Sequence, residues 1–91
     1  MSKFAKKVDA NQNALCKYAK SLGASVQYMH SVGAGFPDVI LGYEGVNYLC
    51  EIKTEKGKLN ALQVEWFKNW KGQAVVVRTE SDIKMLLKGE V

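Results

Sequence analysis

The sequence predicts a single small α/β domain, in which helices flank a small mixed β-sheet. Two observations predict this class. Segments with helical spacing of apolar residues alternate with short runs of β-branched and aromatic residues. A hairpin turn joins two of the predicted strands, whereas a helix precedes the last strand, so the sheet should be mixed. The 91 residues leave room for one domain, predicted over residues 9–91, after a basic, aperiodic arm over residues 1–8.

Composition narrows the function classes. The chain is 47% hydrophobic and 24% charged, which is ordinary for a globular protein and excludes a disordered one. No apolar run approaches the roughly 18 residues of a membrane span, and the N-terminus lacks the apolar segment of a secretory signal. Cys16 and Cys50 match neither a disulfide framework nor a zinc spacing, so a reduced, cytoplasmic protein is expected. The net charge of +4 permits a nucleic-acid partner without establishing one.

The first part of the domain predicts a helix and then a strand. Asp9 followed by Gln12 resembles a capping box, and Gly23 is placed to end the helix. The apolar positions follow the i, i+3, i+4, i+7 pattern, with Leu15, Tyr18, Ala19 and Leu22. Alternation over residues 25–30 predicts a strand, and the glycines of residues 31–36 predict a loop after it.

The middle of the domain predicts a β-hairpin. Strands are expected over residues 38–42 and 46–53, because Glu44-Gly45 between them is a hairpin turn signal. A two-residue turn at this position sets Asp38 opposite Glu51. One face of the sheet therefore collects two carboxylates at one end of the hairpin.

Two opposed carboxylates need an explanation, because at ~5 Å and an effective dielectric of ~20 they repel by about 3 kcal/mol. A divalent cation reverses the sign of this interaction. Oxygens from Asp38, Glu51 and the backbone carbonyl of Ile52 suit Mg²⁺ or Mn²⁺. Lys53 lies two residues beyond Glu51 and hence on the same face, where in a nuclease it would position a water or stabilise charge on the phosphate. The alternative is a structural salt-bridge cluster in which Lys53 neutralises the two carboxylates.

The last part of the domain predicts a helix, a strand and a final helix. Asn60 followed by Gln63 resembles another capping box. One side of this helix is apolar and is expected to lie in the core or in a dimer interface, with base stacking as the alternative: Leu62, Trp66, Phe67 and Trp70. Residues 74–77 predict a strand. Thr79 opens the last helix, whose inward residues are Ile83, Leu86 and Leu87.

The chemical motif resembles that of a known superfamily. Gly35-Phe36-Pro37-Asp38, followed after a gap by Glu51-Ile52-Lys53, resembles the PD-(D/E)XK nuclease motif. Gln63 ahead of Trp66-Phe67, and the strand within Gly72–Arg78, resemble the VRR-NUC branch, the virus-type replication-repair nucleases. The resemblance runs from about Asp9 to Leu87. It implies an αβββαβ(α) restriction-endonuclease-like core and a small, stand-alone, phage-like member of the branch.

The resemblance also implies a function. A metal-dependent endonuclease is expected, which hydrolyses DNA phosphodiester bonds with Mg²⁺ or Mn²⁺ and needs no nucleotide or organic cofactor. It is expected to select branched DNA or Holliday junctions as a homodimer, away from membranes, in the cytoplasm of a bacterial host or a phage-infected cell. Asp38 and Glu51 match the metal ligands and Lys53 matches the catalytic lysine. Gln63 matches a glutamine that orients the lysine, a water or a phosphate, and this role is expected to alternate with helix capping.

One position departs from the family pattern. Many relatives carry a glutamate early in the first helix, where this chain has Gln12. Gln12 is a candidate residue of the metal site, where its neutral amide would bind a metal-bound water or DNA, and the departure leaves open whether one metal or two are held. Asn11 and Gln12 are both expected to face the sheet and to be able to reach the site. The departure leaves open a catalytically weak DNA-binding module, or a subunit of a replication or repair assembly. A nuclease that acts on RNA is a third alternative.

The remaining candidates are contacts to nucleic acid. Lys56 and Lys58 follow the strand that carries Glu51, and they either grip phosphates or belong to a solvated face. Gly33 and Gly35 would let the backbone approach a phosphate. His30 lies beside this loop, where it either contacts a phosphate or forms a structural hydrogen bond.

Overall fold

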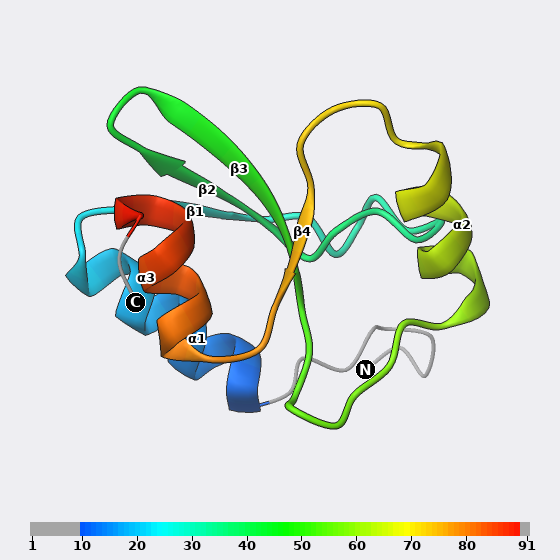
Figure 1. The fold of residues 1–91 in the computed structure, drawn as a ribbon, viewed down its shortest axis with the longest axis horizontal. Coiled ribbons are helices and arrows are strands. Elements are labelled where there is room, and N and C mark those ends of the chain that lie inside the picture. Colours follow the sequence, from blue (N-terminus) through cyan, green and yellow to red (C-terminus); the bar gives the residue numbers. More distant parts are fainter. Residues whose placement is uncertain (1–9, 90–91) are drawn as a thin grey trace.

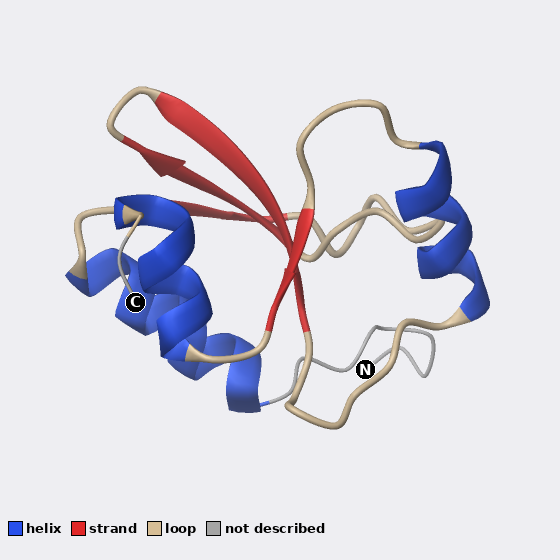
Figure 2. Ribbon diagram, viewed as in Figure 1, coloured by secondary structure: helices blue, strands red, loops and turns tan. Residues whose placement is uncertain are grey.

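The computed structural model describes residues 10–89, so the predicted arm and Asp9 lie outside the described residues. The elements follow the predicted order (Figures 1 and 2). They are α1 (Ala10–Ser21), β1 (Ser25–Tyr28), β2 (Val39–Tyr43), β3 (Val46–Ile52), α2 (Ala61–Asn69), β4 (Val75–Val77) and α3 (Glu80–Lys88). Within residues 10–89, no helix is long and apolar enough to cross a membrane.

The four strands form one mixed sheet in the order β1-β2-β3-β4. The pairs β1–β2 and β2–β3 are antiparallel, whereas β3–β4 is parallel. The parallel pair requires a crossover, and α2 lies in this connection, which confirms the mixed sheet predicted from the sequence.

The hairpin has the predicted register. Tyr43 pairs with Val46, and the ladder continues to Val39 opposite Cys50. Glu44 and Gly45 both have positive φ, 48° and 81°, as a two-residue type I′ turn requires. Because side chains alternate between faces, this register decides which residues share a face at the far end of the hairpin.

The hydrophobic core lies between one face of the sheet and the pair α1 and α3, which lie side by side (Figure 1). Five residues of the hairpin on this face are buried in it: Val39, Leu41, Tyr43, Cys50 and Ile52. From the helices it receives Leu15, Cys16, Ala19, Ile83 and Leu87. Both cysteines are free and buried. Burial raises the pKa of Cys50 to about 12, with a smaller contribution from nearby Cys16.

Helix α2 lies apart from α1 and α3 (Figure 1) and contributes no residue to this core. Of the two places expected for its aromatic side, the core is therefore wrong, whereas a dimer interface, or base stacking as the alternative, stays a prediction. Trp66 and Phe67 are half-buried and Trp70 is 43% exposed. The rings pack on one another instead, with Trp66 stacked on Trp70 at 4.7 Å and Phe36 edge-on to Trp66 at 5.4 Å between ring centroids. Helical spacing identifies an apolar side but not the partner that covers it.

Candidate active site

Asp38 and Glu51 are buried at the end of the hairpin, on the face of the sheet opposite to the core. Asp38 is 3% exposed and Glu51 is 1% exposed. Asp38 directly precedes the Val39–Cys50 pair and so lies across from Glu51, as predicted. Its position is fixed on two sides. The Asp38 backbone carbonyl accepts a hydrogen bond from the N–H of Met29 at 2.8 Å, and its Oδ2 accepts one from the N–H of Ile52 at 2.9 Å.

The backbone of Ile52 adds a third oxygen to this pair. In an extended strand, the N–H and C=O of one residue point toward the same neighbouring strand. Since the Ile52 N–H points to Asp38, the Ile52 carbonyl faces the same edge. No cluster of three or more His, Cys, Asp and Glu side chains occurs among residues 10–89. Two carboxylates and a carbonyl, completed by water, are hard oxygen donors that fit Mg²⁺ or Mn²⁺.

Lys53 lies on the same face as Glu51. Its Nζ is 3.7 Å from Glu51 Oε2, and its side chain is 20% exposed. The Lys53 backbone is held from both sides, because its N–H donates to Val77 O at 3.1 Å and its carbonyl accepts from Asn11 Nδ2 at 2.8 Å. The lysine therefore places a positive charge at the solvent side of a buried carboxylate.

Gln63 connects α2 to the carboxylate pair. Asn60 and Gln63 form the predicted capping box, since Asn60 Oδ1 accepts from Gln63 N and Gln63 Oε1 accepts from Asn60 N, both at 2.9 Å. At the same time, Gln63 Nε2 donates to Glu51 Oε2 at 2.8 Å. Capping and a contact with the carboxylate pair therefore occur at once, so the expectation that Gln63 alternates between the helix cap and the site is wrong. Its expected role toward the lysine, a water or a phosphate stays a prediction.

Gln12 is buried in α1, where its Nε2 lies 2.7 Å from His30 Nε2. The structure thus pairs Gln12 with His30. His30 was expected within the strand, but β1 ends at Tyr28, so His30 lies in the segment that follows it. Asn11 contacts the backbone of Lys53 and, at 3.5 Å, of Arg78. These contacts hold α1 against the ends of β3 and β4.

The connector that carries Lys56 and Lys58 is held by a residue that the sequence analysis missed. Arg78 Nη1 donates to Thr54 O at 2.7 Å and to Gly57 O at 2.5 Å. Lys56 and Lys58 are exposed, as a phosphate contact requires. Its position directly after β4, which lies beside the end of β3, could have indicated that Arg78 contacts the segment following β3.

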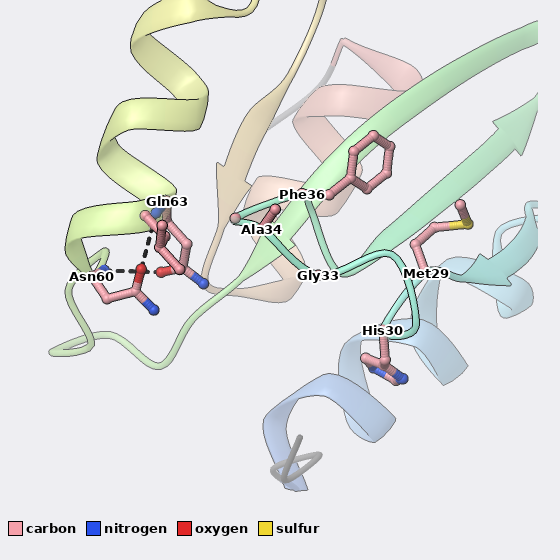
Figure 3. A pocket seen from close by; sticks show the side chains of 9 residues that line it. Met29, His30, Gly33, Ala34, Phe36, Asn60 and Gln63 are labelled. Carbon is pink, nitrogen blue, oxygen red and sulfur yellow. Dashed lines mark hydrogen bonds between the residues drawn. The ribbon is translucent and has the colours of Figure 1, made fainter. Parts of the chain in front are cut away.

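The glycine loop before Asp38 forms a tight turn against α2. Phe36 N donates to Gly33 O at 3.0 Å, and the two residues between them, Ala34 and Gly35, have φ of 53° and 83°, as in a type I′ turn. A Cβ on Gly35 would lie 2.5 Å from Leu62 O, so only glycine fits there. Between this loop and α2 lies a cavity of about 250 Å³ (Figure 3).

Comparisons with known proteins support the fold. No protein-family model matches the sequence, and a search of curated proteins found no match. A solved structure described as a VRR_NUC domain is similar, with a TM-score of 0.67 and 22% identity over 86% of this chain and 95% of that chain. This chain has the fold of a VRR_NUC domain. The predicted restriction-endonuclease-like α/β core is thereby confirmed, whereas the roles of individual residues rest on the geometry described above.

Proposed function

We propose that this protein is a metal-dependent endonuclease that hydrolyses phosphodiester bonds of DNA. The observation that carries the proposal is the buried pair Asp38 and Glu51, with Lys53 on the same face. Burying two opposed carboxylates is unfavourable in a structural role, because each loses hydration and the two repel. A site that holds a divalent cation explains why both are present. The VRR_NUC fold supports the same function class, since the similar domain is named for a nuclease.

Each residue of the site has a separate role in the proposed hydrolysis. Asp38, Glu51 and the Ile52 carbonyl would hold Mg²⁺ or Mn²⁺. Such a cation supplies Lewis-acid chemistry, which polarises the phosphate and makes water more acidic. The Lys53 ammonium orients the attacking water and stabilises the negative charge that develops on the phosphate oxygens. Gln63 fixes the orientation of Glu51, and its own position is fixed by the capping box.

The proposed substrate is branched DNA, including four-way junctions, and the proposed active form is a homodimer. A two-fold dimer presents two sites to two strands, which matches the symmetry of a junction. The net charge of +4 and the exposed Lys56 and Lys58 support a polyanionic substrate. The proposed setting is the cytoplasm of a bacterial host or a phage-infected cell.

A catalytically weak DNA-binding module is the second candidate. The observation that favours it is Gln12, a neutral amide that is engaged with His30 where many VRR-NUC proteins carry a glutamate. Without that carboxylate, one fewer negative charge holds a cation at the site.

A cleavage assay tests the proposal. The protein is incubated with labelled four-way junction, flap, duplex and single-stranded DNA, and with matched RNA, in Mg²⁺, Mn²⁺ or EDTA. We expect metal-dependent cleavage of DNA, with branched substrates cut fastest. Lys53→Ala should abolish cleavage, whereas Lys20→Ala, an exposed lysine at the far end of α1, should not change it. Binding of DNA without cleavage in either metal would favour the second candidate, and preferential cleavage of RNA would overturn the proposed substrate.

A further inference from the structure

The cavity between the glycine loop and α2 has a neutral lining. Figure 3 shows the loop between the Asn60–Gln63 end of α2 and the side chains of Met29 and His30. The lining residues are Met29, His30, Gly33, Ala34, Gly35, Phe36, Asn60, Leu62 and Gln63. Building on the proposed function, we infer that this cavity receives one unpaired nucleobase of the DNA substrate, next to the phosphate that is cleaved.

The chemistry of the lining favours a base over a phosphate. None of the lining residues is a lysine, an arginine or a carboxylate. A phosphate needs cationic or multiple N–H donors, whereas a base has apolar faces and a polar edge. Met29, Phe36 and Leu62 supply apolar surface, and His30 and Asn60 supply polar atoms. At about 250 Å³ the cavity is below the usual range of roughly 300–1,000 Å³ for larger organic ligands, which suits a single ring system.

Two polar side chains retain atoms for the edge of a base. Asn60, which lines the cavity, uses Oδ1 for the helix cap, and its Nδ2 remains a donor that can meet a base. His30 meets Gln12 through Nε2. The second ring nitrogen of His30, Nδ1, is a further polar atom for the edge of a base.

The cavity is formed before any ligand binds. Ala34 is held in the left-handed region, where a residue with a Cβ is less stable by about 1–2 kcal/mol. The Phe36–Gly33 hydrogen bond maintains this conformation, and the close approach of Gly35 to Leu62 O fixes the loop against α2. A rigid wall lowers the entropy lost on binding, as expected of a recognition site.

Gln63 joins this cavity to the carboxylate pair, because it both lines the cavity and donates to Glu51. Only the Gln63 side chain therefore separates a base in the cavity from the proposed site of hydrolysis. Extruding a base from a duplex costs a few kcal/mol, whereas a base in the single-stranded arm of a flap is already unpaired. The cavity would thus select flap-type branched DNA over continuous duplex without any contact that depends on sequence.

Fluorescence of 2-aminopurine tests the inference in EDTA, where DNA binds without being cut. The probe base is placed in turn at each unpaired position of a flap. Leu62→Trp fills the cavity from an exposed position on α2, and Val64→Trp is the matched control, an exposed residue on the same helix that does not line the cavity. We expect the fluorescence to change on binding at one position in the wild-type and Val64→Trp proteins, and not to change in Leu62→Trp.

A second arm removes the base. An abasic site at the responding position should weaken binding of the wild-type protein by about 5- to 150-fold, in line with about 1–3 kcal/mol per recognised base, and should leave binding by Leu62→Trp unchanged. If the protein binds branched DNA but no position responds, or if Val64→Trp behaves as Leu62→Trp does, the inference is overturned and the nuclease proposal stands. If the protein neither binds nor cuts DNA, both are overturned.

Discussion

Replacing Gln63 with methionine tests whether this residue supports the site through Glu51. Methionine keeps most of the side-chain volume and removes both hydrogen bonds. The bond from Nε2 to the buried Glu51 carboxylate is charge-assisted and contributes about 1.5–3 kcal/mol, and the neutral capping bond contributes about 0.5–1.5 kcal/mol. Gln63→Met should therefore lower the free energy of unfolding by about 2–4.5 kcal/mol.

A double-mutant cycle separates the two contributions. In a Glu51→Met background, Gln63→Met removes only the capping bond, so its effect should fall to about 0.5–1.5 kcal/mol. The coupling energy between the two residues should then be about 1.5–3 kcal/mol. Asn60→Ala is the control for the cap and should lower the free energy of unfolding by about 1 kcal/mol in both backgrounds.

Urea unfolding in EDTA, followed by far-ultraviolet circular dichroism, measures these free energies by linear extrapolation. A coupling energy below about 0.5 kcal/mol would refute the reasoning, because the Gln63–Glu51 hydrogen bond would then add no net stability. Equal effects of Asn60→Ala and Gln63→Met would refute it as well, since the cap would then account for the whole effect.

Three further predictions use the same protein. Gly35→Ala should lower the free energy of unfolding, measured in urea, by about 2 kcal/mol or more, because its Cβ would collide with Leu62 O. Gly33→Ala, whose Cβ would meet no atom within 4 Å, should lower it by only about 1 kcal/mol, the cost of its positive φ. Equal effects of the two variants would contradict the close approach of Gly35 to Leu62. Iodoacetamide at pH 8 should leave Cys50 unmodified in the native protein, because a pKa of about 12 leaves about one thiol in ten thousand ionised, and rapid labelling without urea would contradict this burial. Mg²⁺ should raise the melting temperature of the wild-type protein but not that of Glu51→Gln. At a hundredfold excess over Kd, Mg²⁺ binding should add about 2.7 kcal/mol to the free energy of unfolding of the wild-type protein. An equal rise in both proteins would exclude Glu51 as a ligand.

Much of the fold followed from the sequence because its signals are local. Both the turn at Glu44-Gly45 and the capping box at Asn60 depend on residues that are neighbours along the chain. Once the turn was placed, alternation along the strands fixed the pairing up to Asp38 and Glu51 without knowledge of the rest of the fold.

The features that the sequence did not predict depend on contacts between distant segments. Gln12 meets His30 across the end of β1, and Arg78 holds a connector more than twenty residues earlier in the chain. The expectation that the aromatic side of α2 could lie in the core was wrong for the same reason, because Trp66 of this side packs against Phe36 of the glycine loop. Residue type and spacing do not encode such pairings, and a single sequence offers no second signal for them.

The symmetric hairpin has a consequence for protein engineering. Asp38 and Glu51 lie opposite each other because the two strands have equal lengths between them and the turn. They stay opposite only if both strands are lengthened by the same number of residues. The tip at Glu44 and Gly45 is exposed and lies at the end of the hairpin away from the carboxylates. A flexible loop or an epitope inserted there, with the two flanking strands lengthened by the same even number of residues, would leave the two carboxylates opposed. A single residue added to one strand would instead turn one carboxylate toward the core. The tip is thus the position at which this small domain can accept a reporter.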